Sequence, residues 1–180
     1  MDAHQRAAKI KLIAFDIDGV MTDGRLYFTD EGRELKTFNT LDGHGLKALM
    51  NAGIAVVIIT GRRSGCVEAR AKNLGITEFH QGIENKLQVL NDIRNQHQLA
   101  WDDCAFMGDD LIDLPCMLSC GFACAPVNAY PLVRQKADLV TIAQGGSGAV
   151  REACDFILAS QALLDLSIEP YLVAHAESCR

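Results

Sequence analysis

Two aspartates, Asp16 and Asp18, stand directly after a short and largely apolar run at residues 10–15. A run of this length and character predicts a strand that is buried on both faces, as in a parallel sheet. Because side chains alternate along an extended chain, both carboxylates point to the same side at the end of that strand. Two carboxylates so close together repel each other unless a cation lies between them, commonly a divalent one. The doublet therefore predicts a catalytic site at the mouth of a sheet.

The rest of the sequence alternates between strand and helix patterns. Apolar runs at residues 55–59, 105–107, 122–125 and 139–142 predict further buried strands. Amphipathic segments predict helices at residues 43–51, 64–74, 85–97, 111–119, 130–136 and 149–158, and Asp42 is the expected N-cap of the first. This alternation predicts an α/β fold, a doubly wound, Rossmann-like parallel sheet with right-handed crossovers. Ligands of such sheets bind beyond the carboxyl ends of the strands.

One segment interrupts the alternation. Residues 25–29 and 33–38 flank a turn at residues 30–32 and predict a β-hairpin, inserted after the first strand as a flap at about residues 20–38. The remaining intervals are too short for a cap domain, so we expect one domain over residues 1–180. The tail at residues 166–180 has weak periodicity, and either a docked or a loose tail is compatible with it.

Composition narrows the possible partners. The chain of 180 residues has a net charge of −6 and no basic stripe, which argues against nucleic acid as a partner. Its apolar runs are strand-sized and well below the roughly 18–20 residues of a membrane span, so we expect no membrane partner. The first residues have no apolar core of a secretory signal, and we expect a cytoplasmic location.

Polar residues follow three of the predicted strands, and another opens one of the predicted helices. Besides the doublet they are Thr60, Gly61 and Arg62 after the second strand, Lys86 at a helix start, and Asp109, Asp110 and Asp113 after a later strand. A hydroxyl, a flexible backbone and cations can hold a phosphoryl group. Two acidic clusters can bind a divalent cation beside it. Together these groups predict Mg²⁺-dependent phosphoryl transfer.

The order of these motifs resembles a known superfamily. DxDGV at 16–20, ITGR at 59–62, NK at 85–86 and GDDxxD at 108–113 are similar to the motifs of the haloacid dehalogenase-like phosphatases. Longer stretches at 38–45, 74–77, 81–86, 108–115 and 145–152 resemble one branch, the 3-deoxy-D-manno-octulosonate 8-phosphate phosphatase family of lipopolysaccharide core biosynthesis. The resemblance covers most of the chain.

The resemblance implies a role for each motif residue. Asp16 would be the nucleophile that forms an aspartyl-phosphate, and Asp18 the general acid and base. Mg²⁺ would be held by Asp16, the backbone carbonyl of Asp18 and Asp109, with Asp110 nearby or bound through water. The phosphate would be stabilised by Thr60, Gly61 and Lys86, and Asp113 would orient Lys86.

The resemblance also implies a set of sugar-binding residues: Asp18, Asn39, Thr40, Leu41, Asp42, Gly43, Lys47, Arg62 and Arg70. Leu41 and Lys47 stand where many relatives have arginine, and Ser147 stands where a basic residue is usual. An open site without a cap would hold a small sugar phosphate weakly. The projecting hairpin favours a neighbouring subunit that closes each pocket, and the resemblance implies a homotetramer in which hairpins pair between subunits.

Two alternatives remain open. A phosphatase for a nine-carbon sugar-acid 9-phosphate would use the same chemistry, and the length of the pocket and the positions of Leu41 and Lys47 would decide between the two substrates. A non-catalytic scaffold of the same fold is a different class, in which a motif carboxylate can be lost without loss of the fold. The motif carboxylates are intact in this sequence, which favours an enzyme.

Overall fold

A parallel sheet of six strands forms the centre of the computed structural model, which describes residues 1–177. The strand order is β5-β4-β1-β6-β7-β8, and all five neighbouring pairs are parallel. The strands are β1 (Leu12–Phe15), β4 (Ala55–Thr60), β5 (Glu78–Gln81), β6 (Cys104–Met107), β7 (Phe122–Ala125) and β8 (Leu139–Val140). The predicted α/β fold is confirmed. The last predicted strand is shorter than expected, since it ends at Val140.

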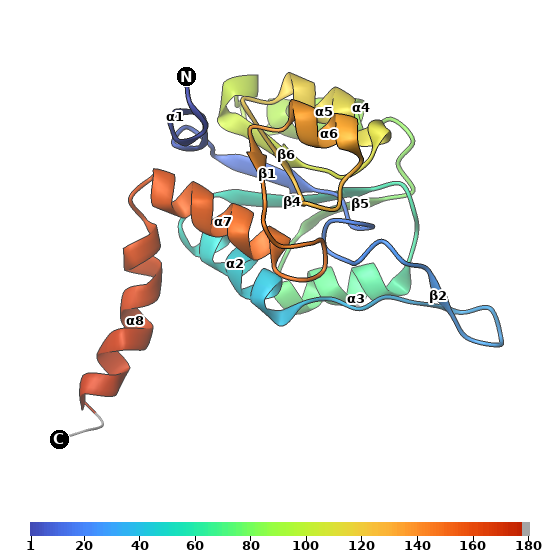
Figure 1. Ribbon diagram of the computed structural model, residues 1–180, viewed down its shortest axis with the longest axis horizontal. Coiled ribbons are helices and arrows are strands. Elements are labelled where there is room, and N and C mark those ends of the chain that lie inside the picture. The colour runs from blue at the N-terminus through green and yellow to red at the C-terminus, as the bar shows by residue number, and fades with distance from the viewer. Residues whose placement is uncertain (178–180) are drawn as a thin grey trace.

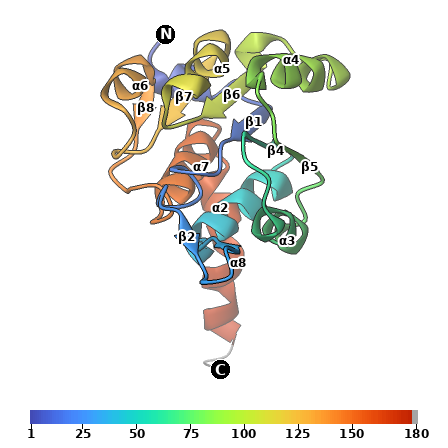
Figure 2. The ribbon, with the colours of Figure 1, turned by 90° about the vertical axis from the view of Figure 1, so that its right-hand side faces the viewer.

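Helices cover both faces of this sheet. One face carries α2 (Thr40–Asn51), α3 (Gly65–Leu74) and α7 (Ala149–Ser160), and the other carries α4 (Lys86–Gln96), α5 (Leu114–Ser119) and α6 (Pro131–Lys136) (Figures 1 and 2). Alternate side chains of β1 pack into two separate hydrophobic cores, Ile13 and Phe15 into one and Leu12 and Ala14 into the other. Burying one large apolar side chain contributes about 1.5–3 kcal/mol. Two cores therefore hold β1, and the residues that follow it, in a fixed position.

The predicted N-cap of α2 was wrong. The helix begins at Thr40, and the side chain of Asn39 caps it by accepting a hydrogen bond from the Leu41 amide at 2.8 Å. Asp42 lies within the first turn and is buried. Both residue types favour this position, and Asn39 occupies it because Asp42 has a partner elsewhere in the fold.

The predicted hairpin is present as β2 (Tyr27–Phe28) and β3 (Glu34–Leu35), paired antiparallel. It projects from the body of the protein (Figure 1). Leu26, Phe28 and Leu35 on it are about half exposed. Between β1 and β4 the chain forms this hairpin and α2 as its only regular elements.

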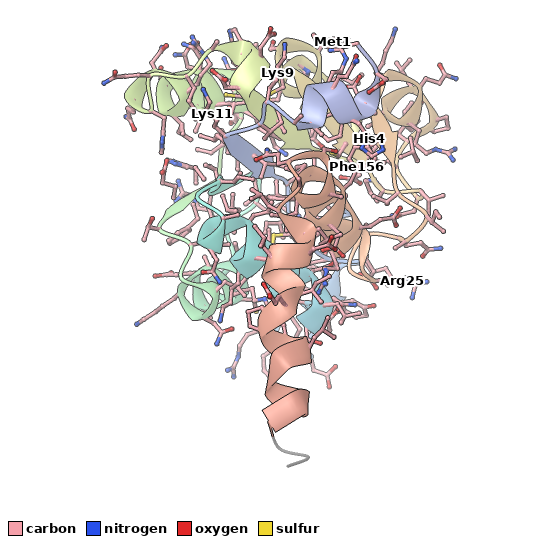
Figure 3. All side chains as sticks on the ribbon, turned by 90° about the vertical axis from the view of Figure 1, so that its left-hand side faces the viewer. Met1, His4, Lys9, Lys11, Arg25 and Phe156 are labelled. Carbon is pink, nitrogen blue, oxygen red and sulfur yellow. The ribbon has the colours of Figure 1, made fainter. Side chains whose placement is uncertain are left out.

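Within residues 1–177, a short 3₁₀ helix at Trp101–Asp103 and two α-helices were not predicted. α1 (Ala3–Ala7) packs on α7, where the His4 ring stacks on Phe156 with centroids 4.3 Å apart (Figure 3). α8 (Leu164–Glu177) takes up most of the predicted tail and extends away from the body (Figures 1 and 2). Residues 178–180 of that tail lie outside the described residues. Over residues 1–177, no helix combines the length and apolar character needed to cross a membrane.

Candidate active site

The carboxyl ends of β1 and β6 lie side by side. Phe15, the last residue of β1, is in register with Met107, the last residue of β6, and the Asp16 amide donates to the Met107 carbonyl at 3.0 Å. Asp109 follows two residues after Met107. The chain continues from β1 to β4 on one side and returns to β6 on the other, so the strand order reverses here. This is the position at which doubly wound sheets bind ligands.

Three carboxylates meet at this point. Asp16, Asp109 and Asp113 each offer an oxygen, and these oxygens lie within 4.8 Å of one another. Asp16 is 5% exposed and Asp113 is fully buried. A glycine allows Asp109 to lie close to the loop after β1: Gly19 has φ +88°, and a Cβ there would overlap the Asp109 carboxylate.

Lys86 is the only cation that directly contacts this cluster among the residues the structure describes. It begins α4, and its Nζ lies 2.9 Å from Asp16 Oδ2 and 2.7 Å from Asp113 Oδ1. The other oxygen of Asp113 accepts hydrogen bonds from the amides of Asp109 and Asp110 at 3.0 and 3.3 Å. Asp113 thus fixes both Lys86 and the loop after β6. Its contact with Lys86 is the one that was predicted.

The cluster has an excess of negative charge. Burial, and then the charge of Asp113, raise the pKa of Asp16 to about 6. Burial, followed by the charges of Asp113 and Asp16, raises the pKa of Asp109 to about 7. Burial also works against the charged form of Lys86, but its ion pairs with Asp16 and Asp113 outweigh this and raise its pKa. One ammonium faces three carboxylates, so the site favours a second cation.

The donor set fits a hard divalent cation. Asp109 Oδ1 is buried and has no hydrogen-bond partner, and an unpaired buried carboxylate oxygen is costly unless a ligand uses it. Carboxylate oxygens are the ligands that Mg²⁺ prefers. Both oxygens of Asp113 accept from Lys86 or from backbone amides, whereas Asp109 keeps an oxygen without a partner, so Asp109 is the better candidate of these two. Asp16 would join Asp109 as a ligand in addition to its contacts with Lys86 and the Ile17 amide. Asp110 is exposed and its Oδ1 accepts from the Leu111 amide at 2.7 Å, so its predicted ligand role stays a prediction.

Thr60 and Gly61 lie at the adjacent strand end. Ile58 of β4 is in register with Phe15, so Thr60 and Gly61 lie beyond the level at which β1 ends. Thr60 is buried, and a Cβ at Gly61 would find only the Ile83 carbonyl, at 3.7 Å. The structure therefore places Thr60 and Gly61 at the strand end next to the one that carries Asp16.

Asp18 has partners that the sequence analysis missed. Lys36 Nζ donates to Asp18 Oδ1 and lies 3.2 Å from Glu34 Oε1. Arg62, a predicted sugar-binding residue, joins this group with Nη2 at 3.1 Å from Glu34 Oε1 and Nε at 3.8 Å from Asp18 Oδ2. Glu34 begins β3 and Lys36 directly follows this strand, two residues later, and this opposite-charge spacing was the available signal.

A second group of predicted sugar-binding residues surrounds Arg70. Its Nη2 donates to the Asn39 carbonyl at 2.8 Å, and its guanidinium lies over the Phe38 ring at 5.7 Å. A Cβ at Gly43 would overlap this guanidinium. Arg70 thus anchors the segment between the hairpin and α2. The contacts of this group are with each other, and its role toward a sugar stays a prediction.

Asp42 binds the first turn of α7. Its Oδ1 accepts a hydrogen bond from the Arg151 amide at 2.9 Å, and burial raises its pKa. A carboxylate at this place complements the positive end of the helix. Its predicted contact with a sugar stays a prediction.

The remaining members of the sugar-binding set lie on the surface of α2. Thr40 and Leu41 are exposed on its first turn. Lys47 lines a groove of about 590 Å³ between α2 and α8, with His44 and Tyr171. The groove is built from other elements than the carboxylate cluster, so the structure does not bring Lys47 together with Asp16.

The glycine-rich segment before α7, residues 145–148, packs against the loop after β1. A Cβ at Gly145 would overlap the Gly19 carbonyl, and the Gly146 amide donates to the Val20 carbonyl at 3.0 Å. Ser147, where a basic residue is usual, is exposed. The segment therefore contributes backbone packing behind Gly19.

No family model matches this chain, but individual phosphatases of known sequence or structure are similar to it. It is 46% identical to the 3-deoxy-D-manno-octulosonate 8-phosphate phosphatase KdsC of Yersinia pestis, over 91% of this chain and 88% of that protein. A solved protein from Pseudomonas syringae, described as a probable YrbI-family phosphatase, matches with a TM-score of 0.93 and 49% identity, covering 95% of this chain and 97% of that one. The Moraxella catarrhalis 3-deoxy-D-manno-octulosonate 8-phosphate phosphatase, solved with magnesium, phosphate and KDO, matches with a TM-score of 0.92 and 41% identity, covering 94% and 97%.

Proposed function

Since the chain belongs to the 3-deoxy-D-manno-octulosonate 8-phosphate phosphatase family of haloacid dehalogenase-like hydrolases, we propose that it releases phosphate from this sugar-acid ester. It is then a phosphoric monoester hydrolase that uses Mg²⁺, and its product is the free sugar acid of the lipopolysaccharide core. One observation carries the proposal: Asp16, Asp109 and Lys86 converge in a buried cluster at the switch point of the sheet. A location in the cytoplasm stays a prediction.

In the first chemical step, an oxygen of Asp16 attacks phosphorus. The phosphorus–oxygen bond to the sugar breaks, and its electron pair goes to the sugar oxygen, which takes a proton from Asp18. The hydrogen bond from Ile17 to Asp16 Oδ1, at 2.7 Å, and the ion pair with Lys86 hold the nucleophile in place. Lys86, Thr60 and the Gly61 amide stabilise the charge on the phosphoryl oxygens.

In the second step, water attacks the aspartyl-phosphate. Asp18, now a carboxylate, takes a proton from the water, and the bond between Asp16 and phosphorus breaks to give inorganic phosphate. Asp18 is 21% exposed at its side chain, so water can reach it. Asp16 and Asp109 would hold Mg²⁺, and the bound ion screens the negative charge of the nucleophile from that of the phosphate.

We further propose a homotetramer assembled through the hairpins. The half-exposed Leu26, Phe28 and Leu35 on a projecting hairpin support it, because such residues together mark an interaction surface. Sedimentation of the variant Phe28→Ser/Leu35→Ser, compared with the wild type, tests this. Leu118→Ser, which changes an exposed leucine on α5, is the matched control. A tetramer that survives the hairpin change would contradict the proposal.

The proposed activity is tested by phosphate release from a panel of sugar-acid phosphates with Mg²⁺. We expect preference for the eight-carbon 3-deoxy acid, and loss of release in Asp16→Asn. Comparable rates on nine-carbon 9-phosphates would favour the nine-carbon alternative over the proposed substrate. No release from any ester, by a folded protein with Mg²⁺, would favour the non-catalytic scaffold.

A further inference from the structure

The hairpin places a buried lysine against the acid–base aspartate. The side chain of Lys36 is only 2% exposed, although it belongs to a projecting element. Its Nζ contacts Asp18 Oδ1 and Glu34 Oε1, and these two carboxylates are 21% and 14% exposed at their side chains. An exposed ion pair between long side chains contributes little, but a buried one confines both partners to one geometry.

This contact distinguishes the two oxygens of Asp18. Oδ1 is taken by Lys36, whereas the nearest cation to Oδ2 is Arg62 Nε at 3.8 Å, beyond hydrogen-bonding distance. Oδ2 is therefore the oxygen that remains available to give and take a proton. A fixed rotamer matters for this task, because proton transfer requires a heavy-atom distance of about 2.6–3.2 Å.

We propose that Lys36 is a positioning residue for the phosphatase reaction, which holds Asp18 so that Oδ2 exchanges protons with the leaving oxygen and with water. The inference rests on the proposed function, in which Asp18 is the general acid and base. It links the hairpin to the chemistry, since Glu34 and Lys36 both come from the hairpin. Glu34 is in turn tied to the body by Arg62 at 3.1 Å and by Cys66 Sγ, 3.8 Å from its carbonyl.

The leaving group provides a test that a general structural role would not satisfy. A sugar alkoxide is a poor leaving group and needs a proton from Asp18 as its bond to phosphorus breaks. p-Nitrophenolate leaves readily without one. Because kcat/KM reports the steps up to the departure of the leaving group, a misplaced Asp18 lowers it for the sugar ester and not for p-nitrophenyl phosphate.

The experiment compares kcat/KM on both esters, with Mg²⁺, for Lys36→Met, Lys36→Gln and the wild type. We expect Lys36→Met to lose about 10–100-fold on the sugar-acid phosphate and less than about threefold on p-nitrophenyl phosphate. Lys36→Gln, which keeps a donor without the charge, provides the same comparison if Lys36→Met does not fold. Arg33→Met, at an exposed cation of the same hairpin, is the control and should match the wild type on both esters.

The outcomes separate this inference from the proposed function. Equal losses on both esters, or no loss on the sugar ester, would overturn the positioning role while the wild-type activity stands. A wild-type protein that hydrolyses neither ester would refute the proposed function, and the positioning role with it. A burst of p-nitrophenol in Lys36→Met would support the role of Asp18 in the second step, since hydrolysis of the aspartyl-phosphate would then be slowed.

Discussion

Replacing Lys86 by methionine should destabilise the metal-free protein, and by an amount that depends on pH. The substitution keeps most of the side-chain volume and removes the ammonium that lies 2.9 Å from Asp16 and 2.7 Å from Asp113. Both partners are buried, and removing one member of a buried ion pair costs about 3–5 kcal/mol. We expect this loss in the free energy of unfolding at about pH 8, where the carboxylates are charged.

The sign of the pH dependence follows from the raised pKa values. Asp16, with a pKa of about 6, and Asp109, with a pKa of about 7, both lie above the ordinary 3.8, so folding favours their protonated forms. That contribution is present at low pH and is lost as pH rises through the folded-state values. For Asp16 alone the rise corresponds to about 3 kcal/mol. At about pH 5 most Asp16 and Asp109 side chains are protonated, so Lys86 has fewer negative charges to stabilise. We therefore expect Lys86→Met to cost only about 1–2 kcal/mol at this pH.

The measurement is urea unfolding of the wild type and Lys86→Met in EDTA at both pH values. Lys11→Met is the matched control, because Lys11 pairs with Asp103 at 3.1 Å but is 64% exposed at its side chain. The control should cost less than about 1 kcal/mol at either pH. A loss for Lys86→Met below about 1 kcal/mol at the higher pH, or the same loss at both, would refute the reasoning about the cluster.

Two further expectations concern the same cluster. Mg²⁺ should raise the melting temperature more at about pH 8 than at about pH 5, because Asp16 and Asp109 must lose their protons to bind it. Differential scanning fluorimetry at both pH values measures this, and a shift that does not depend on pH would count against these ligands. Gly19→Ala should abolish most Mg²⁺-dependent phosphate release and lower stability by more than the ~1–2 kcal/mol of a left-handed alanine, because its Cβ would overlap the Asp109 carboxylate. Gly32→Ala, where φ is +76° and no atom lies within 4 Å of the new Cβ, should cost only that strain in urea unfolding and leave phosphate release intact.

Most of the fold could be predicted from local patterns, because the apolar runs that form the four central strands are buried on both faces, while the run at 139–142 forms a short and partly exposed edge strand. β1, β4, β6 and β7 all fall on predicted runs, and a doubly wound order is the common arrangement for such alternation. The convergence of Asp16 and Asp109 followed from the same reasoning, since carboxyl ends of parallel strands share one edge.

What could not be predicted depends on contacts between distant segments. Asp42 and Asn39 are equally good N-caps by residue type, and the choice is decided by the Arg151 amide, 109 positions later, which binds Asp42. The contact between Lys36 and Asp18 depends on where the chain after the hairpin lies relative to the end of β1. Patterns within one segment carry no information on either contact.

The most direct test of the central claim is to locate the phosphoryl group on the protein. Asp18→Asn is mixed with p-nitrophenyl phosphate and Mg²⁺, quenched in acid and digested, and the phosphopeptide is sequenced by tandem mass spectrometry. The account predicts a phosphoryl group on Asp16, and none in the double variant Asp16→Asn/Asp18→Asn. A phosphoryl group on another residue, or its persistence in that double variant, would contradict Asp16 as the nucleophile.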